Sequence, residues 1–420
     1  MHSHANRLSL WNRVLRRFGY VPPSEDDLLL RSEVNQCISC LKANTSRYRE
    51  VGSLDVPTSA RTCNAFAWRL LQHLTEPQAE NVFFSPCGIV LALAVAYNGA
   101  CGETKQAIAT TLGLGDASLE EVNTRNANLL SALTSAYESA QVCIATSLWG
   151  KYLDRMSIEF IRSCQEHYDA DVRDLAEGPD AINAWIHQKT QGLIDGVVGK
   201  IEPLVYAIVI NTVYFHSKWE TPFLPEATRD TVFTMQNGRR QVCPMMYQSG
   251  NYPYQRTQTF QAARLPYKDG FSMVAFLPNS GVSLKEMLAV LTQDNWESRR
   301  ERFRDMDGSI GLPRFRFDYS TNLKEILIQM GMGIAFDPAA DFSGMSPEFY
   351  LGNIQHRAFV EVNEEGTTAA AVTAEELCGS SGPPPERFTL ILDRPFYCAI
   401  EDERTGALLF LGMVMNPSQK

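Results

Sequence analysis

The sequence lacks both an excess of basic residues and any long apolar run. Its 420 residues carry 38 Lys and Arg against 48 Asp and Glu, which gives a formal net charge of -10 at pH 7. A general binder of the nucleic-acid backbone needs the opposite balance, so we expect no nucleic-acid partner. No apolar run approaches the roughly 18 residues that a transmembrane helix needs. With 45% hydrophobic residues, the composition is typical of a soluble globular protein with a large core.

Cysteine is also sparse, with 10 residues in the whole chain, which argues against a disulfide scaffold. Only Cys37 and Cys40 form a CxxC pair. No second ligand pair at zinc spacing accompanies them, so we predict no metal site and interpret them as a surface pair. Scattered single cysteines favour a reducing, intracellular compartment over an oxidising one. The compartment in which this protein acts stays open, because an extracellular location is also possible.

The sequence motifs of the common enzyme classes are missing. We find no P-loop, no HExxH and no GxGxxG placed after a predicted strand. The stretch GSSG at residues 379–382 is not the GxSxG of a nucleophile elbow, and it lies in a predicted loop. We therefore expect a protein that is not an enzyme and that needs no cofactor.

Residues 1–59 differ from the rest of the chain and are predicted to be an N-terminal extension. Leu8, Trp11, Leu15 and Phe18 recur at helical spacing among arginines, with no acidic residue before Glu25. This pattern fits a transit peptide or a membrane-surface helix, but we favour a short amphipathic helix or a disordered tail. A secretory signal is not expected, because no apolar core follows the basic residues.

The residues from about 60 onward predict an α+β fold. Helices are expected at residues 61–74, 89–98, 156–168 and 181–193, where apolar residues follow a helical period. Residues 206–215 (YAIVINTVYF) predict a strand buried on both faces. Further strands are expected at residues 260–267, 272–277, 308–316, 356–364, 388–391, 396–401 and 408–414. Helices come mostly before strands without regular alternation, which favours large, mainly antiparallel sheets.

One segment, between the strands that end near residue 364 and begin at residue 388, is too long for an ordinary connection. It opens with small residues and closes on Gly382 and three prolines. Loops of this length inside a compact domain are usually functional or disordered. This loop is therefore the first place to seek function.

Several motifs that lie in order along residues 60–420 resemble those of the serpin family. They are NVFFSP at 81–86, GET at 102–104, INTVYF at 210–215, KW at 218–219, LPRF at 312–315, DFSGM at 341–345, VNEEGTTAAA at 362–371, DRPF at 393–396 and FLG at 410–412. The resemblance implies a serpin domain over residues 60–420, with three β-sheets, surrounding helices and an exposed reactive-centre loop at about 364–387.

The resemblance also implies a function, since loop insertion by serpins is an established form of strand addition. A protease cleaves the loop, becomes covalently attached to it, and is trapped when the loop enters the central sheet. The implied hinge consists of Glu364, Glu365, Gly366, Thr367, Thr368, Ala369, Ala370 and Ala371. Alternate residues of an inserted strand face the protein body. That inward set, Thr367, Ala369, Ala371 and Thr373, is small and uncharged.

Counting from the hinge places the reactive bond at Ser380–Ser381, to within one residue. Leu377, Cys378 and Gly379 precede this bond and would set its specificity. Because no basic residue lies there, we expect an elastase-like or subtilisin-like serine protease as the partner, with a papain-like cysteine protease as the alternative. The inhibitor itself is expected to be a monomer.

The family resemblance further implies a sheet-opening region formed by Ser85, Asn211, His356, Trp219 and Arg314. Two residues depart from the family pattern. Gly88 stands where a hydroxyl residue is usual. Glu375 continues the inward alternation with a carboxylate, whose burial is costly. The second departure keeps open a non-inhibitory serpin that acts as a carrier, chaperone or storage protein, although the small-residue hinge favours an inhibitor.

Overall fold

The computed structural model describes residues 56–75, 80–135, 137–194, 196, 198–202, 205–293, 296–346, 349–365 and 386–419. Its main helices are α3 (Val56–Leu74), α4 (Pro86–Gly99), α5 (Gly102–Leu112), α6 (Leu119–Thr134), α7 (Ile158–Tyr168), α8 (Gly178–Lys189), α9 (Leu284–Gln293), α10 (Trp296–Arg300) and α11 (Lys324–Leu327). None of the helices in these residues is long and apolar enough to cross a membrane.

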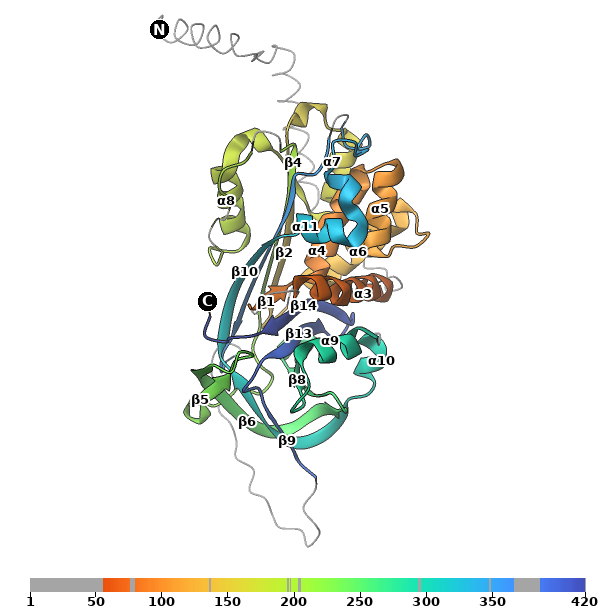
Figure 1. The fold of residues 1–420 in the computed structure, drawn as a ribbon. Coiled ribbons are helices and arrows are strands. Elements are labelled where there is room, and N and C mark those ends of the chain that lie inside the picture. Colours follow the sequence, from red (N-terminus) through yellow and green to blue (C-terminus); the bar gives the residue numbers. More distant parts are fainter. Residues whose placement is uncertain are drawn as a thin grey trace, which may run out of the picture.

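Five strands form the sheet that runs through the upper half of Figure 1, in the spatial order β10-β11-β4-β2-β3. They are β2 (Gln141–Gly150), β3 (Asp171–Asp174), β4 (Ala207–His216), β10 (Phe315–Asn322) and β11 (Asn353–Val362). The pairs β10/β11 and β2/β4 are antiparallel, whereas the central pair β4/β11 is parallel. The sheet therefore has a parallel boundary between two antiparallel halves.

The other nine strands form a second hydrogen-bonded sheet with the path β1-β14-β13-β8-β7-β6-β9-β12, from which β5 branches at β6. They are β1 (Val82–Phe84), β5 (Arg229–Thr234), β6 (Arg240–Arg256), β7 (Phe260–Pro266), β8 (Phe271–Pro278), β9 (Arg304–Pro313), β12 (Phe388–Ile391), β13 (Phe396–Asp402) and β14 (Ala407–Val414). The long β6 pairs with β5 and β9 along most of its length and with β7 only at its end. Two of the three expected sheets are therefore joined into this one hydrogen-bonded sheet, because β6 pairs with strands of both.

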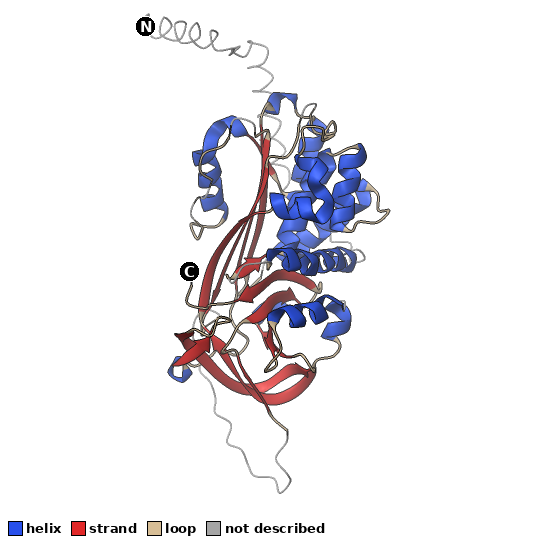
Figure 2. Ribbon diagram, viewed as in Figure 1, coloured by secondary structure: helices blue, strands red, loops and turns tan. Residues whose placement is uncertain are grey.

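Helices cover both faces of the five-stranded sheet. Helices α3 to α7 lie on one side and α8 lies on the other (Figures 1 and 2). The larger core places α4, which is buried along almost its whole length, against the inner residues of β4 and β11. A smaller core joins Trp185 and Ile186 of α8 to Ile210 and Tyr214 of β4. Alternate residues of β4 therefore enter different cores, which explains its continuous apolar sequence.

Capping residues explain where several of the helices begin and end. Ser85 precedes α4, and its side chain accepts a hydrogen bond from the Gly88 amide while Pro86 occupies the first turn. Ser118 and Glu121 form a reciprocal capping box at the start of α6. Gly113 adopts a left-handed conformation (φ 75°) at the end of α5, where a glycine costs least. These short-range contacts fix the ends of the helices that cover the sheet.

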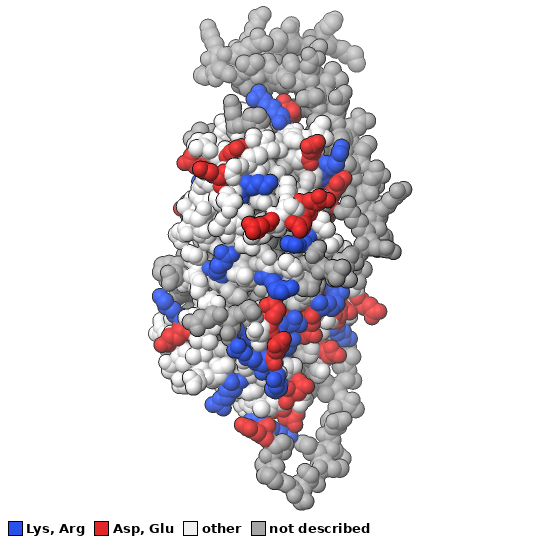
Figure 3. Space-filling view, turned by 90° about the vertical axis from the view of Figure 1, so that its right-hand side faces the viewer, with Lys and Arg blue, Asp and Glu red and all other residues white. Residues whose placement is uncertain are grey.

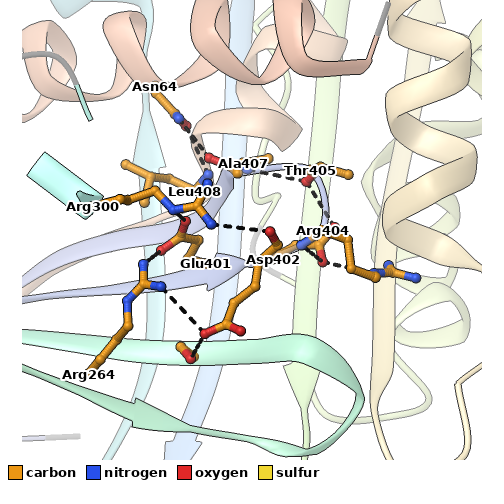
Figure 4. A network of polar contacts seen from close by, with 12 residues as sticks. Asn64, Arg264, Arg300, Glu401, Asp402, Arg404, Thr405, Ala407 and Leu408 are labelled. Atoms are coloured by element: carbon orange, nitrogen blue, oxygen red, sulfur yellow. Dashed lines mark hydrogen bonds and ion pairs between the residues drawn. The ribbon is translucent and has the colours of Figure 1, made fainter. Parts of the chain in front are cut away.

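A buried polar network joins the helical layer to the turn between β13 and β14 (Figure 4). Glu401 is fully buried and forms ion pairs with Arg264 and Arg300. Burial raises the pKa of the Glu401 carboxyl, and the two guanidinium groups oppose that rise. Asn64 of α3 donates to the Gly406 carbonyl at 2.8 Å and accepts from the Leu408 amide at 2.9 Å.

On the face shown in Figure 3, acidic and basic side chains are intermixed over the lower half.

The elements predicted from sequence are largely confirmed, with one correction. The strand expected at residues 308–316 is two strands, because β9 ends at Pro313 and β10 begins at Phe315 in the other sheet. The proline ends β9, and Arg314 lies at the crossing between the sheets. Helices α5, α6, α9, α10 and α11 and strands β1, β2, β3, β5 and β6 were not predicted from the sequence.

Candidate functional site

The most distinctive feature of the five-stranded sheet is the boundary between β4 and β11. Eight residue pairs run in parallel register across it, from Ile208 opposite Asn353 to Phe215 opposite Val360. Parallel pairing is slightly weaker per residue than antiparallel pairing. A chain that left the end of β11 and turned back would run antiparallel to both β11 and β4. The boundary is therefore where such a returning strand would match the direction of both neighbours.

On the outer face of the sheet, polar side chains hold β10 to β11. Arg357 donates to both carboxylate oxygens of Asp318, at 2.9 and 3.1 Å. Gln355 donates to Ser320 at 3.0 Å, and Asn322 donates to Asn353 at 3.0 Å. Each of these contacts joins β10 to β11 and does not reach β4. They therefore hold β10 and β11 together as a pair.

A buried histidine spans the boundary on the inner face of the sheet. His356 of β11 is fully buried, and its Nδ1 lies 2.9 Å from Oδ1 of Asn211, its register partner on β4. Its Nε2 accepts the backbone amide of Ser85 at 3.0 Å. This acceptor role requires the neutral tautomer with hydrogen on Nδ1, which then donates to Asn211. Burial accordingly lowers the pKa of His356 to about 3.

Gly88, in the first turn of α4, makes room for this contact. A Cβ at residue 88 would lie 2.5 Å from Asn211 Oδ1 and 2.5 Å from Val213 Cγ2. The side chain of Asn211 thus occupies the space that a hydroxyl residue at 88 would need. Asn211 also donates to Thr146 Oγ1 of β2 at 3.1 Å. The polar cluster of Ser85, Asn211 and His356 is therefore complete in this chain without a hydroxyl at position 88.

A second cluster lies at the end of β11, around the first hinge residue. The Glu364 carboxylate is buried, pairs with Arg314 (Nε to Oε1, 2.7 Å) and accepts from Thr228. Burial favours the neutral carboxyl, but these two hydrogen bonds outweigh it and lower the pKa of Glu364. The Glu364 carbonyl accepts from the Phe223 amide at 2.9 Å. Both the backbone and the side chain of Glu364 are therefore fixed.

Trp219 supports this end of β11. Its indole Nε1 donates to the Asn363 carbonyl at 2.8 Å, and its backbone amide donates to the Glu365 carbonyl at 3.3 Å. The indole ring is buried and stacks on Tyr267, with ring centroids 3.9 Å apart and planes 9° apart. A cavity of about 450 Å³ opens beside the cluster, between Glu364, Arg316 and Pro417. The residues that directly follow β11 are thus held by the side chain and backbone of Trp219.

The structure places the predicted site residues in two groups rather than one. Ser85, Asn211 and His356 meet beneath the boundary, whereas Trp219 and Arg314 meet Glu364 and Glu365 at the end of β11. Thr228 and Asn363 also belong to the second group but were not predicted as site residues: no motif marks Thr228, and Asn363 takes part through its backbone carbonyl. The remaining hinge and loop residues lie outside the described residues: Gly366, Thr367, Thr368, Ala369, Ala370, Ala371, Leu377, Cys378, Gly379, Ser380 and Ser381.

These observations define an α+β protein with a parallel pair of strands, β4 and β11, at the centre of its five-stranded sheet. The model of the serpin (serine protease inhibitor) family matches residues 61–417. The chain belongs to the serpin family.

Named proteins and solved structures of this family are similar to the chain over most of its length. The leukocyte elastase inhibitor A of Mus musculus is 32% identical over 84% of this chain and 97% of its own length. The native thermophilic serpin tengpin is similar with a TM-score of 0.80 and 30% identity, over 90% of this chain and 98% of that one. Human thyroxine-binding globulin, solved with its hormone, gives a TM-score of 0.79 and 26% identity, over 87% and 100%.

The low pKa of His356 makes the stability of the fold depend on pH. Between about pH 6.5 and 3 the unfolded chain binds a proton at His356 that the folded chain does not. The free energy of unfolding should therefore fall as the pH falls below about 6.5, by up to about 1.4 kcal/mol per pH unit from this group. Urea unfolding from pH 7.5 to 5 should show this slope. It should be reduced in His356→Gln, and an equal slope in both proteins would contradict the assignment.

Gly88→Ser should destabilise the folded state by about 1–3 kcal/mol, because the new side chain displaces Asn211 from His356. The melting temperature should fall by about 2–9 °C. Gly199→Ser is the matched control, since an added Cβ at this exposed glycine meets nothing within 4 Å. Equal melting temperatures for the two variants would show that the space beside Asn211 does not matter.

Proposed function

We propose that this serpin inhibits serine endopeptidases as a suicide substrate, by inserting residues 366 onward between β4 and β11 after cleavage. The observation that carries the proposal is the parallel boundary directly beside the hinge. A strand that continued from Glu365 back along β11 would gain hydrogen bonds on both sides, each worth about 1 kcal/mol net. Residues 60–420 form the proposed inhibitory domain, and residues 1–59 form an extension to it.

The chemistry of trapping follows from the proposed reactive bond. The protease nucleophile forms an ester with the carbonyl carbon of Ser380, the peptide bond breaks, and Ser381 leaves as the new amino terminus. Insertion of the freed segment then carries the acyl-enzyme along the sheet before water can hydrolyse the ester. The small residues Thr367, Ala369, Ala371 and Thr373 suit the inward positions of that strand.

Known relatives support this proposal and also define its competitor. The elastase inhibitor named above favours inhibition, whereas thyroxine-binding globulin shares the fold and was solved with a bound small molecule, which favours a carrier function. The small uncharged hinge favours the inhibitor, because bulky or charged inward residues would resist insertion. Leu377, Cys378 and Gly379 favour an elastase-like or subtilisin-like target. A papain-like cysteine protease remains the alternative target, and we propose a monomeric inhibitor.

Cleavage of the loop should convert the protein into a much more stable form. Limited digestion with pancreatic elastase or subtilisin, at residues 377–382, should raise the melting temperature by more than about 10 °C, since several kcal/mol of new sheet pairing shift it by this much. An active-site-blocked protease serves as the control and should leave the melting temperature unchanged. A complex that survives denaturing electrophoresis should accompany the rise. An unchanged melting temperature after complete cleavage would favour the carrier function.

Glu375 should lower the efficiency of trapping, because the inward alternation would bury its carboxylate during insertion. Glu375→Leu is therefore expected to reduce the number of inhibitor molecules consumed for each protease trapped. Glu376→Leu is the matched control, since the neighbouring residue faces outward in the same alternation. Titration of subtilisin with each variant measures this ratio. No decrease for Glu375→Leu relative to Glu376→Leu would argue against burial at position 375.

A further inference from the structure

Two cysteines meet where α3 and α4 pack on β14. Cys63 lies in α3 and Cys87 lies in the first turn of α4, and both are fully buried. Their side chains hydrogen-bond to each other. Cys87 Sγ also donates to the Leu408 carbonyl at 3.2 Å, and Asn64, the residue after Cys63, accepts from the Leu408 amide (Figure 4). Three elements that are distant in sequence therefore hold the two thiols together.

The residues around the two thiols are small, which suits the close approach that a disulfide needs. Ala60 and Ala67 lie one turn before and one turn after Cys63 on the same face of α3, and both are buried. On α4, the residue that follows Cys87 is Gly88, which has no side chain. A disulfide requires Cα atoms within about 7 Å of each other. Because the thiols are already in contact, a bond between them needs only a small movement of the two helices.

The folded protein itself resists oxidation at this place. The hydrogen bond to Cys63 and burial both raise the pKa of the Cys87 thiol. Since the thiolate is the reactive form of cysteine, the pair reacts poorly once α3 and α4 have packed. Oxidation is therefore expected during folding, before the core closes. A bond formed at that stage would be reduced slowly afterwards, because the core excludes the reductant.

We propose that Cys63 and Cys87 are a disulfide site that ties α3 to α4 when the chain folds in an oxidising compartment. One cysteine thiolate attacks a small-molecule disulfide such as glutathione disulfide, which releases one thiol and leaves a mixed disulfide on the protein. The second cysteine thiolate then attacks the protein sulfur of this mixed disulfide and releases the other thiol. The protein loses two electrons and two protons, and the oxidant gains them.

The bond would change the stability of the protein with the compartment in which it folds. It would close a loop of 25 residues, 63–87, and a loop of this length is expected to raise the melting temperature by about 5 °C. Cys87 is two residues from Ser85, whose amide binds His356. The start of α4 beneath the β4/β11 boundary would thus be tied covalently to α3. This inference does not depend on whether the protein inhibits proteases.

The test compares the full chain produced in the periplasm and in the cytoplasm of a bacterium. Both folded proteins are treated with dithiothreitol, which removes accessible disulfides, and are then alkylated. Peptide mapping by mass spectrometry should find Cys63 linked to Cys87 in the periplasmic protein, which should melt about 5 °C higher than the cytoplasmic one. The link should be lost when urea accompanies the dithiothreitol. Absence of the linked peptide, or a link with no rise in melting temperature, would overturn the proposal.

Two variants distinguish this pair from the other cysteines. Cys164 of α7 is fully buried like Cys63, and burial raises the pKa of its thiol without a contribution from a second cysteine. The difference in melting temperature between periplasmic and cytoplasmic protein should disappear in Cys63→Ala and remain in Cys164→Ala. Each variant is compared only with itself, so the loss of a buried side chain cancels. Cys87→Ala tests the same bond from its other end. An equal difference in Cys63→Ala and Cys164→Ala would show that this pair is not the site.

Discussion

The arrangement of the sheet depends on one hydrogen bond, between His356 and Asn211 across the β4/β11 boundary. Both residues are buried, and the loss of a hydrogen bond between buried polar groups is costly. His356 also accepts the amide of Ser85, the residue that caps α4. The same histidine therefore joins two strands and the start of a helix. The central helix cannot shift along the sheet without disturbing the boundary.

The contacts on either side of the boundary differ from those across it. Polar pairs fasten β11 to β10 on the outer face, and β4 pairs with β2 over ten antiparallel residue pairs. Across the boundary itself, the outer face offers Tyr214 and Phe359, whose rings are 6.0 Å apart. These rings and the His356–Asn211 pair are side-chain contacts that cross the boundary.

Much of this could be read from the sequence, and the remainder shows the limits of local patterns. The apolar run of β4 and the family motifs predicted the central strand, the residues of the first polar cluster and Trp219, Arg314, Glu364 and Glu365 of the second. They did not predict that these residues form two clusters, because the distance between Ser85 and Trp219 depends on how two sheets are joined. The single strand expected at 308–316 failed for the same reason: Pro313 and Arg314 lie where the chain changes sheets. Thr228 and Gly308 carry no pattern of their own, since their roles come from the side chains that they face.

Gly88 and Gly308 show how this chain uses missing side chains. At Gly88 the vacant space holds the Asn211 amide, and at Gly308 it holds the Phe388 ring. In each case a residue distant in sequence fills the space, so the contact exists only when the strands and helices are correctly assembled. Such contacts add nothing to local structure and act entirely on tertiary arrangement. The polar one lies beneath the boundary between β4 and β11, and the apolar one lies where β12 pairs with β9. A substitution at either glycine would therefore disturb the packing between elements rather than the element that carries the glycine.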